Sequence, residues 1–309
     1  MAADTRQTEF RAPTSFKLRN FVRRQMRRVF QPKVVRKDRL IVADDADRCT
    51  NPVFLIGVHR SGTTLVRQII DSHSRIACPA ESFFIYGLAE LFGNDLYQEG
   101  FEAMGFDREG IARGLRRTAD FFFDAYRRSK DKPRWADKTP QYVQILDFIE
   151  EVFGPDCQYI VIYRHPLDII NSLLATRWDF SAPRWDFMRF HDDHFTNLSM
   201  YVGDGIQKQL DFEAAHPQRC RRLRYEQLVT EPEPVLRDVF EFLGEPWEEQ
   251  VLAFYKQPHD RGRGHADAAF MKGFRPSLEN WKGWTPEQIR LAGDIVAPQL
   301  EQLEYRVDV

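Results

Sequence analysis

The chain has 309 residues, with 44 lysines and arginines against 46 aspartates and glutamates, so its formal net charge is −2. Hydrophobic residues make up 43% and aromatic residues 13% of the sequence, which excludes a disordered or fibrous protein. The near-zero net charge argues against a dedicated nucleic-acid binder, because such proteins are usually basic. The four cysteines are scattered, so we expect reduced thiols in the cytoplasm rather than a disulfide framework or a zinc site.

The first 47 residues differ in character from the rest of the chain. Ten basic residues and one acidic residue lie between Phe16 and Arg39. Apolar residues recur among them at helical spacing until Pro32, which predicts an amphipathic helix with a solvated basic face. Contact with a membrane surface or an anionic partner is the alternative. We therefore expect an arm at 1–47 and one domain at 48–309, with neither a signal peptide nor a spanning helix.

Short apolar runs and helical patterns alternate along the domain. The expected strands are 52–57, 158–163 and 219–225, and the expected helices are 64–70, 83–130, 142–153, 166–174 and 235–243. Pro166 suits the first turn of its helix, where a missing N–H costs nothing. Alternating strands and helices predict an α/β fold with a central parallel sheet flanked by helices on both faces.

The segment 57–64, GVHRSGTT, follows the first expected strand and leads into a helix. Its spacing matches the phosphate loop G-x-x-x-x-G-K-[ST], except that Thr63 replaces the lysine. Backbone N–H groups and the helix N-terminus can still hold an anion, while the group that reaches β- and γ-phosphates is lost. We therefore expect an anion shorter than a nucleoside triphosphate, held with the help of Arg60, Thr63 and Thr64. A plain strand-to-helix turn is the alternative.

A second arginine follows the strand expected at 158–163. Arg164 comes directly after this strand, and Ser172 lies about two helical turns further on. Ligands of open parallel sheets bind at the carboxyl ends of strands, so Arg60 and Arg164 are expected to face one crevice. An arginine fork suits phosphate oxygens, and a serine hydroxyl adds a donor. Taken alone, Arg164 is as compatible with a surface ion pair.

Four motifs in order resemble sulfotransferases that use 3′-phosphoadenosine 5′-phosphosulfate (PAPS). They are GVHRSGTTL at 57–65, YRHPLDIINS at 163–172, LRYEQLVTEP at 223–232 and WKGWTPE at 281–287. The resemblance is greatest to tyrosylprotein sulfotransferases and bacterial tailoring enzymes, and it implies a P-loop-like three-layer fold with PAPS as donor. On this resemblance, the residues expected to bind the donor are Arg60, Ser61, Gly62, Thr63, Thr64, Arg164, Ser172, Tyr225 and Lys282.

The resemblance also implies a catalytic glutamate, and Glu81 stands at the matching place beyond the first helix. The apolar residues at 83–85 would favour a raised pKa of its carboxyl group, as a general base needs. A carboxylate placed on a helix dipole is the structural alternative. His59, which stands where the family often has proline, and His194 are competing candidates for the base.

Lys138, in the segment WADKTP, resembles the family lysine that stabilises the bridging oxygen of the leaving nucleotide. Asp137 beside it is a candidate orienting partner, and a surface lysine is the alternative. Further along, Lys272, Arg275 and Lys282 lie in a region that the resemblance places over the 3′-phosphate, and Lys282 is preferred because Trp281 anchors it.

The spacing of His191 and His194 is compatible with a metal site, but two ligands do not make one and no metal is expected. The nearby aromatic residues are expected to form a wall of the acceptor pocket or part of the core. These residues are Trp178, Trp185, Phe187 and Phe190.

The sequence therefore predicts a sulfotransferase that moves the sulfuryl group of PAPS to a hydroxyl or amine of a small-molecule or peptidyl acceptor. Glu81 is the predicted base, with Lys138 and Arg60 as the cations of the transition state. A small-molecule kinase using Mg-ATP and a non-catalytic nucleotide-binding module are the alternatives. The acceptor and the oligomeric state cannot be read from the sequence.

Overall fold

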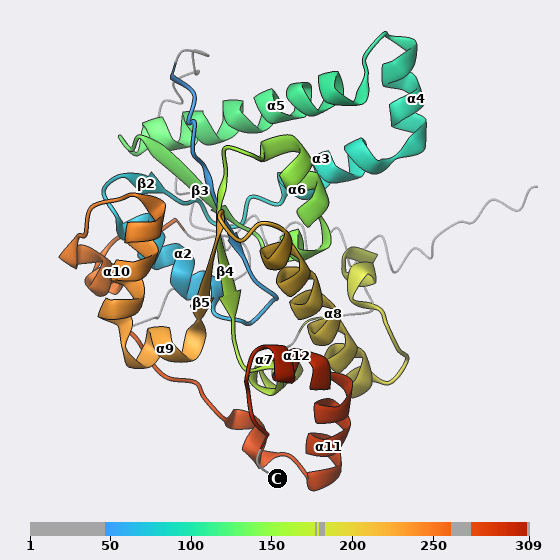
Figure 1. Cartoon of the computed structure of the whole chain (residues 1–309), viewed down its shortest axis with the longest axis vertical. Coiled ribbons are helices and arrows are strands. Elements are labelled where there is room, and N and C mark those ends of the chain that lie inside the picture. The colour runs from blue at the N-terminus through green and yellow to red at the C-terminus, as the bar shows by residue number, and fades with distance from the viewer. Residues whose placement is uncertain (1–46, 177, 179–182, 261–272, 308–309) are drawn as a thin grey trace, which may run out of the picture. The chain divides into compact units, whose positions relative to one another are not determined.

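A computed structural model describes residues 47–176, 178, 183–260 and 273–307 of the chain (Figure 1). Apart from Asp47, the predicted basic arm lies outside these residues and stays a prediction.

The strands are β1 (Val53–Ile56), β2 (Ile76–Ala77), β3 (Arg134–Lys138), β4 (Gln158–Tyr163) and β5 (Cys220–Arg224). The α-helices are α2 (Thr63–Ser72), α3 (Phe84–Gly93), α4 (Asp95–Ala103), α5 (Arg108–Ser129), α6 (Leu146–Phe153), α7 (Pro166–Leu174), α8 (His194–Ala215), α9 (Tyr225–Thr230), α10 (Pro232–Leu243), α11 (Pro286–Ile295) and α12 (Ala297–Gln302). Short 3-10 helices are η2 (Pro140–Gln144), η3 (Pro183–Met188), η4 (Glu249–Lys256) and η6 (Asn280–Gly283).

The five strands form a sheet in the order β2-β3-β1-β4-β5. Every neighbouring pair is parallel, with Leu55 of β1 opposite Lys138 of β3 and Ile160 of β4. The chain leaves β1 toward β2 and β3 on one side, and later crosses to β4 and β5 on the other. The carboxyl end of β1 is therefore the point where the direction of winding changes, which is where open α/β sheets bind ligands.

Side chains of the central strands alternate between two buried cores. Val53 and Leu55 pack into the core under α2, α9, α10 and η4, whereas Phe54 and Ile56 pack into the core under α5, α6, α7 and α8. Figure 1 shows these two groups of helices on opposite sides of the sheet. Strands buried on both faces have near-continuous apolar sequences, as β1 and β4 do. The predicted parallel three-layer fold is confirmed.

Several expected elements differ from those observed. The single helix expected over 83–130 is three helices, α3, α4 and α5, and the helix expected from residue 142 begins as η2 before α6. β3 and α8 were not predicted. β1, β4, β5 and α7 lie where the sequence indicated, and Pro166 occupies the first turn of α7.

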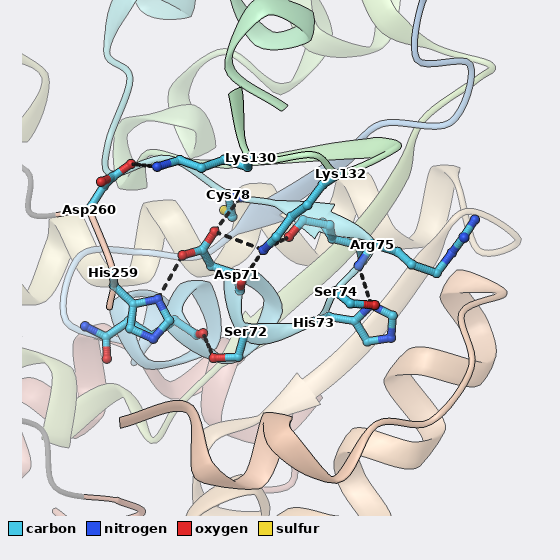
Figure 2. Close-up of polar contacts among 12 residues, drawn as sticks. Asp71, Ser72, His73, Ser74, Arg75, Cys78, Lys130, Lys132, His259 and Asp260 are labelled. Carbon is cyan, nitrogen blue, oxygen red and sulfur yellow. Dashed lines mark hydrogen bonds and ion pairs between the residues drawn. The ribbon is translucent and has the colours of Figure 1, made fainter. Parts of the chain in front are cut away.

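A polar cluster fastens the end of α2 that is remote from its N-terminal loop (Figure 2). Asp71 accepts the backbone N–H of Cys78 at 3.0 Å and lies 2.8 Å from His259 Nδ1. Lys132 donates to the carbonyl of Asp71 at 2.6 Å, and Lys130 pairs with Asp260 at 3.1 Å. The cluster joins α2, β2 and residues 259–260, and we assign it a structural role.

Within the described ranges, no helix combines the length and the apolar character needed to cross a membrane.

Candidate active site

The loop between β1 and α2 leaves the N-terminus of α2 without a side-chain cap. Gly62 precedes α2 with a φ of 98° and gives the helix no side-chain cap. A Cβ at Gly62 would lie 2.5 Å from the ring of Tyr225, so both the backbone angle and the close ring require glycine. Arg60 also has a positive φ, 72°. The first N–H groups of α2 are thereby left for an anionic ligand.

The two arginines predicted to share a crevice do lie together. Arg60 donates through Nε to Ser172 Oγ at 2.9 Å, and Arg164 donates to the carbonyl oxygen of Arg60 at 2.9 Å. The guanidinium of Arg164 also lies 4.6 Å from the ring centre of Tyr225 and donates to the carbonyl of Ser277. The carboxyl ends of β1, β4 and β5 thus converge on one cluster.

This cluster lines a cavity of about 260 Å³. Seven of the residues predicted to bind or act on the donor are on its wall: Arg60, Gly62, Thr63, Thr64, Arg164, Ser172 and Tyr225. The wall also includes His59, Pro140, Trp178 and, from the C-terminal part, Gly273, Arg275 and Ser277. Positive charge, backbone N–H groups and hydroxyls together make this a cavity for an anion.

Two buried polar atoms test whether the cavity fits a phosphorylated ligand. Ser61 Oγ and Arg164 Nε are buried and have no hydrogen-bond partner among the described residues, and of the two residues only Arg164 is on the cavity wall. Burying a polar group without a partner costs about 1–3 kcal/mol, so such atoms at a binding site are usually satisfied by a ligand or water. A donor atom on Arg164 beside an uncapped helix N-terminus suits phosphate oxygens.

The predicted catalytic pair lies at the carboxyl end of β3. Lys138 is 1% exposed and donates through Nζ to Glu81 Oε1 at 2.6 Å. Desolvation lowers the pKa of Lys138, against the opposing effect of Glu81. Neither residue is on the wall of the cavity, although Pro140, two positions after Lys138, is. The pair and the cavity therefore occupy neighbouring positions along the same edge of the sheet.

His59, the alternative base, is enclosed by aromatic rings. Its Nδ1 lies 2.6 Å from the hydroxyl of Tyr201, and its ring is within 6.0 Å of the rings of Trp178, Trp185 and Phe187. His59 and Trp178 both line the cavity. The aromatic residues were predicted to form either a pocket wall or part of the core, and both occur. Trp185 is buried in the core, and Trp178 lines the cavity.

A model of the sulfotransferase family matches residues 52–249, which include the loop, Glu81, Lys138, Arg164 and Tyr225. The chain belongs to the sulfotransferase family. This assignment confirms the predicted sulfotransferase enzyme and gives no support to the kinase alternative.

Relatives and solved structures agree with this assignment. Protein-tyrosine sulfotransferase A of Caenorhabditis elegans is 27% identical over 275 residues, covering 85% of this chain and 70% of the relative. Protein-tyrosine sulfotransferase of Drosophila melanogaster is 26% identical over 269 residues, covering 82% and 51%. The sulfotransferase domain of the Synechococcus PCC 7002 olefin synthase has a TM-score of 0.59 at 22% identity, covering 86% of this chain and 98% of that domain. This sulfotransferase therefore shares the fold of that domain.

Some residues predicted for the sulfotransferase site lie elsewhere. Lys282 is half exposed, pairs with Glu279 at 2.8 Å and is not on the cavity wall. Arg275, which the sequence ranked behind it, is on the wall. Lys272 lies outside the described residues. Arg275 could be ranked above Lys282 only from the path of the chain after residue 272. The sequence contains no local signal for this path.

The histidines suspected of binding a metal have other contacts. His191 Nδ1 accepts the backbone N–H of Asp193 at 2.9 Å, and the carboxylate of Asp193 caps α8. Across the described parts of the chain, no group of three or more histidines, cysteines and acidic residues is placed to hold a metal ion. His194, the third candidate for the base, begins α8 and is not on the cavity wall.

Proposed function

We propose that this enzyme uses PAPS as its donor and transfers the sulfuryl group to a hydroxyl of an acceptor. The observation that carries the proposal is the cavity in which a phosphate-loop-like backbone, Arg164 and Ser172 meet. PAPS supplies an activated sulfuryl group together with a 5′- and a 3′-phosphate. The replacement of the loop lysine by Thr63 fits such a donor better than a nucleoside triphosphate.

The 5′-phosphosulfate is proposed to bind the loop and the 3′-phosphate the second strand end. The first N–H groups of α2 would hold the 5′ side, with hydroxyls added by Thr63 and Thr64, and Ser61 beside the loop stays a prediction. Arg164 and Ser172 hold the 3′-phosphate, and Arg275 adds charge from the C-terminal part. This assignment is supported by the unpartnered Nε of Arg164 and by the position of Arg164 and Arg275 on the cavity wall. Lys282 stays a prediction without such support.

Proton transfer is proposed to involve Glu81. Its carboxylate takes the proton of the acceptor hydroxyl, while Lys138 and Arg60 stabilise negative charge that develops on the transferred and leaving oxygens. The buried position of Lys138 supports this role, because a cation acts more strongly where water is excluded. Lys138 Nζ and Glu81 Oε1 lie 2.6 Å apart, which places the proposed base and cation together at the sheet edge beside the cavity.

The acceptor is proposed to be a hydroxyl compound or a peptide side chain. His59 and Trp178 give the cavity an aromatic side, which favours an acceptor with an apolar, planar portion. We also propose a cytoplasmic location, because all four cysteines are free and buried, as expected in a reducing compartment.

Turnover of the donor tests the proposal directly. Release of 3′,5′-adenosine bisphosphate from PAPS would be measured with 2-naphthol, a tyrosine-containing peptide and 1-octanol as acceptors. We expect acceptor-dependent release, abolished in Arg60→Ala and unchanged in the surface control Arg237→Ala. Phosphoryl transfer from Mg-ATP without turnover of PAPS would support the kinase alternative. Donor binding with no turnover of any acceptor, unaffected by Glu81→Gln, would favour the non-catalytic module.

A further inference from the structure

The end of β3 contains a buried carboxylate that the proposed chemistry does not use. Asp137 is 0% exposed, and its Oδ2 accepts hydrogen bonds from Ser82 Oγ at 2.7 Å and from the hydroxyl of Tyr142. The two hydroxyl oxygens lie 2.9 Å apart. The oxygens of Asp137, Ser82 and Tyr142 thus form a compact triangle in which both hydroxyls donate to the carboxylate, and we call it the Asp137 triangle.

The Asp137 triangle and the catalytic pair interlock through neighbouring residues. Consecutive residues of a strand point to opposite faces, so Asp137 faces the core that contains Tyr142, and Lys138 faces the core under α2. Glu81 bonds to Lys138, and the next residue, Ser82, bonds to Asp137. The segment that carries Glu81 therefore holds the end of β3 from both faces. Contacts on both faces of β3 fix the rotation of the segment that contains Glu81 and Ser82. The ion pair between Glu81 and Lys138 alone would leave this rotation free.

The backbone after Ser82 has a conformation that needs such an anchor. Phe83 has a φ of 58°, a region that costs a bulky side chain about 1–3 kcal/mol. Its own side chain is 44% exposed, so packing does little to offset this strain. The N–H of Phe84 turns back to the carbonyl of Ser82 at 2.7 Å. Ser82 is thus the residue through which the strained turn is tied to the sheet.

We propose that Asp137, acting through Ser82 and supported by Tyr142, is a positioning residue for sulfuryl transfer. The Asp137 triangle holds the Glu81 carboxylate opposite Lys138 in the orientation that accepts the acceptor's proton. Asp137 touches neither the cavity nor the reacting atoms. The inference rests on the proposed role of Glu81, and it adds a reason why a carboxylate, an unusual group for the interior of a sheet, stands next to the catalytic lysine.

The test compares kcat for release of 3′,5′-adenosine bisphosphate, using whichever of the three acceptors gives the highest turnover. In Asp137→Asn and Ser82→Ala, kcat should fall on the order of 10-fold to 100-fold, because misplacing a reacting group by about 1 Å costs this much. The KM for PAPS and the calorimetric Kd for 3′,5′-adenosine bisphosphate should not change. Ser82→Thr, which keeps the hydroxyl, should retain most of kcat. Asp120→Asn, which changes another buried aspartate, on α5, controls for general loss of stability and should retain kcat.

A double-mutant cycle separates positioning from other effects. If Asp137 acts through Glu81, Asp137→Asn should change kcat little in a Glu81→Gln background, because the group that it positions is already absent. Equal losses in both backgrounds, or an unchanged kcat in Ser82→Ala and Asp137→Asn, would overturn the inference alone. A wild-type kcat in Glu81→Gln would overturn the proposed base together with the inference.

Discussion

The buried pair of Glu81 and Lys138 has consequences for stability that differ from those for catalysis. Removing one partner of a buried ion pair leaves a charge without compensation and costs about 3–5 kcal/mol, whereas replacing both partners by neutral groups is often tolerated. Lys138 is nearly inaccessible, so Glu81→Gln should lower the free energy of unfolding, and the double variant with Lys138→Met should recover most of it.

The double variant of Glu81→Gln and Lys138→Met should recover stability but not activity. Removing a general base costs about 100-fold to 10,000-fold, and the double variant should be no more active than Glu81→Gln. Urea unfolding and donor turnover, measured on the same preparations, check both statements. A double variant that regains activity as well as stability would show that the pair is only structural.

The carboxyl group of Asp137 predicts a pH dependence of stability. Burial raises its pKa from 3.8 to about 6, and the unpartnered Oδ1 can carry the proton. Between these values the folded protein binds more protons than the unfolded chain, so this group's contribution to stability falls as the pH rises through that window. The full effect is about 3 kcal/mol, from 1.36 kcal/mol per pKa unit.

Asp137→Asn removes this titration. Between pH 4 and pH 7, the free energy of unfolding of the variant should increase relative to that of wild type by up to about 3 kcal/mol, so that the variant becomes relatively more stable. Urea unfolding at several pH values measures the difference. A difference that is constant with pH, or that moves in the other direction, would contradict the raised pKa.

Most of the residues predicted to bind the donor lie at one cavity, but not all of them do. Arg60 and Arg164 could be expected at one crevice because each follows a recognisable apolar strand and strand ends converge, and Ser172 lies in the helix after the second strand. Arg275 follows no such strand, and the anchoring of Lys282 by Trp281 suggested a position that the cavity wall does not include. The Asp137 triangle joins residues 55 and 60 positions apart, which no spacing rule connects.

Among the elements, β3 illustrates why a strand can escape detection. Its sequence, RWADK, contains three charged residues, yet every position is buried. Arg134 donates to the carbonyls of Asn51 and Leu243 and to Gln158 Oε1, partners that lie between 24 and 109 positions away. Buried charges of this kind are satisfied only in the folded chain, so hydrophobic periodicity cannot predict them.

The division of the region 83–130 into three helices could have been read locally. Asn94 accepts the N–H of Tyr97 at 3.3 Å to cap α4, and Asp107 accepts the N–H of Gly110 at 2.7 Å to cap α5. Asparagine and aspartate are preferred helix caps. Gly105, with a φ of 88°, separates the two helices. The two capping residues and the glycine are all visible in the sequence. The prediction missed them because the helical spacing of apolar residues continues across the breaks.

The loop before α2 should be sensitive to a single methyl group. Gly62→Ala places a Cβ at a φ of 98° and against the ring of Tyr225, so the loop or the ring must move. The affinity for 3′,5′-adenosine bisphosphate should fall by at least about tenfold, because an altered loop loses its aligned N–H groups. Gly87→Ala, in α3 with open space around it, is the matched control and should leave affinity unchanged. Equal affinities for Gly62→Ala and wild type, measured by calorimetry, would contradict the role of the loop.

At the scale of the whole molecule, alternating strands and helices sufficed to predict a parallel sheet covered on both faces. The strand order β2-β3-β1-β4-β5 depends on long-range pairing that the sequence does not show. This order places β1 in the middle, with the loop, the proposed catalytic pair and Arg164 at the ends of β1, β3 and β4. Three separate segments thereby reach one edge of the sheet, as the carboxyl-end rule anticipates.

We propose that this edge of the sheet binds a nucleotide carrying a 3′-phosphate. Isothermal titration calorimetry with 3′,5′-adenosine bisphosphate, adenosine 5′-monophosphate and Mg-ATP tests it most directly. We predict that the bisphosphate binds most tightly and that Arg164→Ala weakens it about 10-fold to 100-fold, as expected for hydrogen bonds to a charged group. Adenosine 5′-monophosphate should bind weakly and respond little to Arg164→Ala. Tighter binding of Mg-ATP, or an equal loss of affinity for the monophosphate and the bisphosphate in Arg164→Ala, would show that the edge has no 3′-phosphate site.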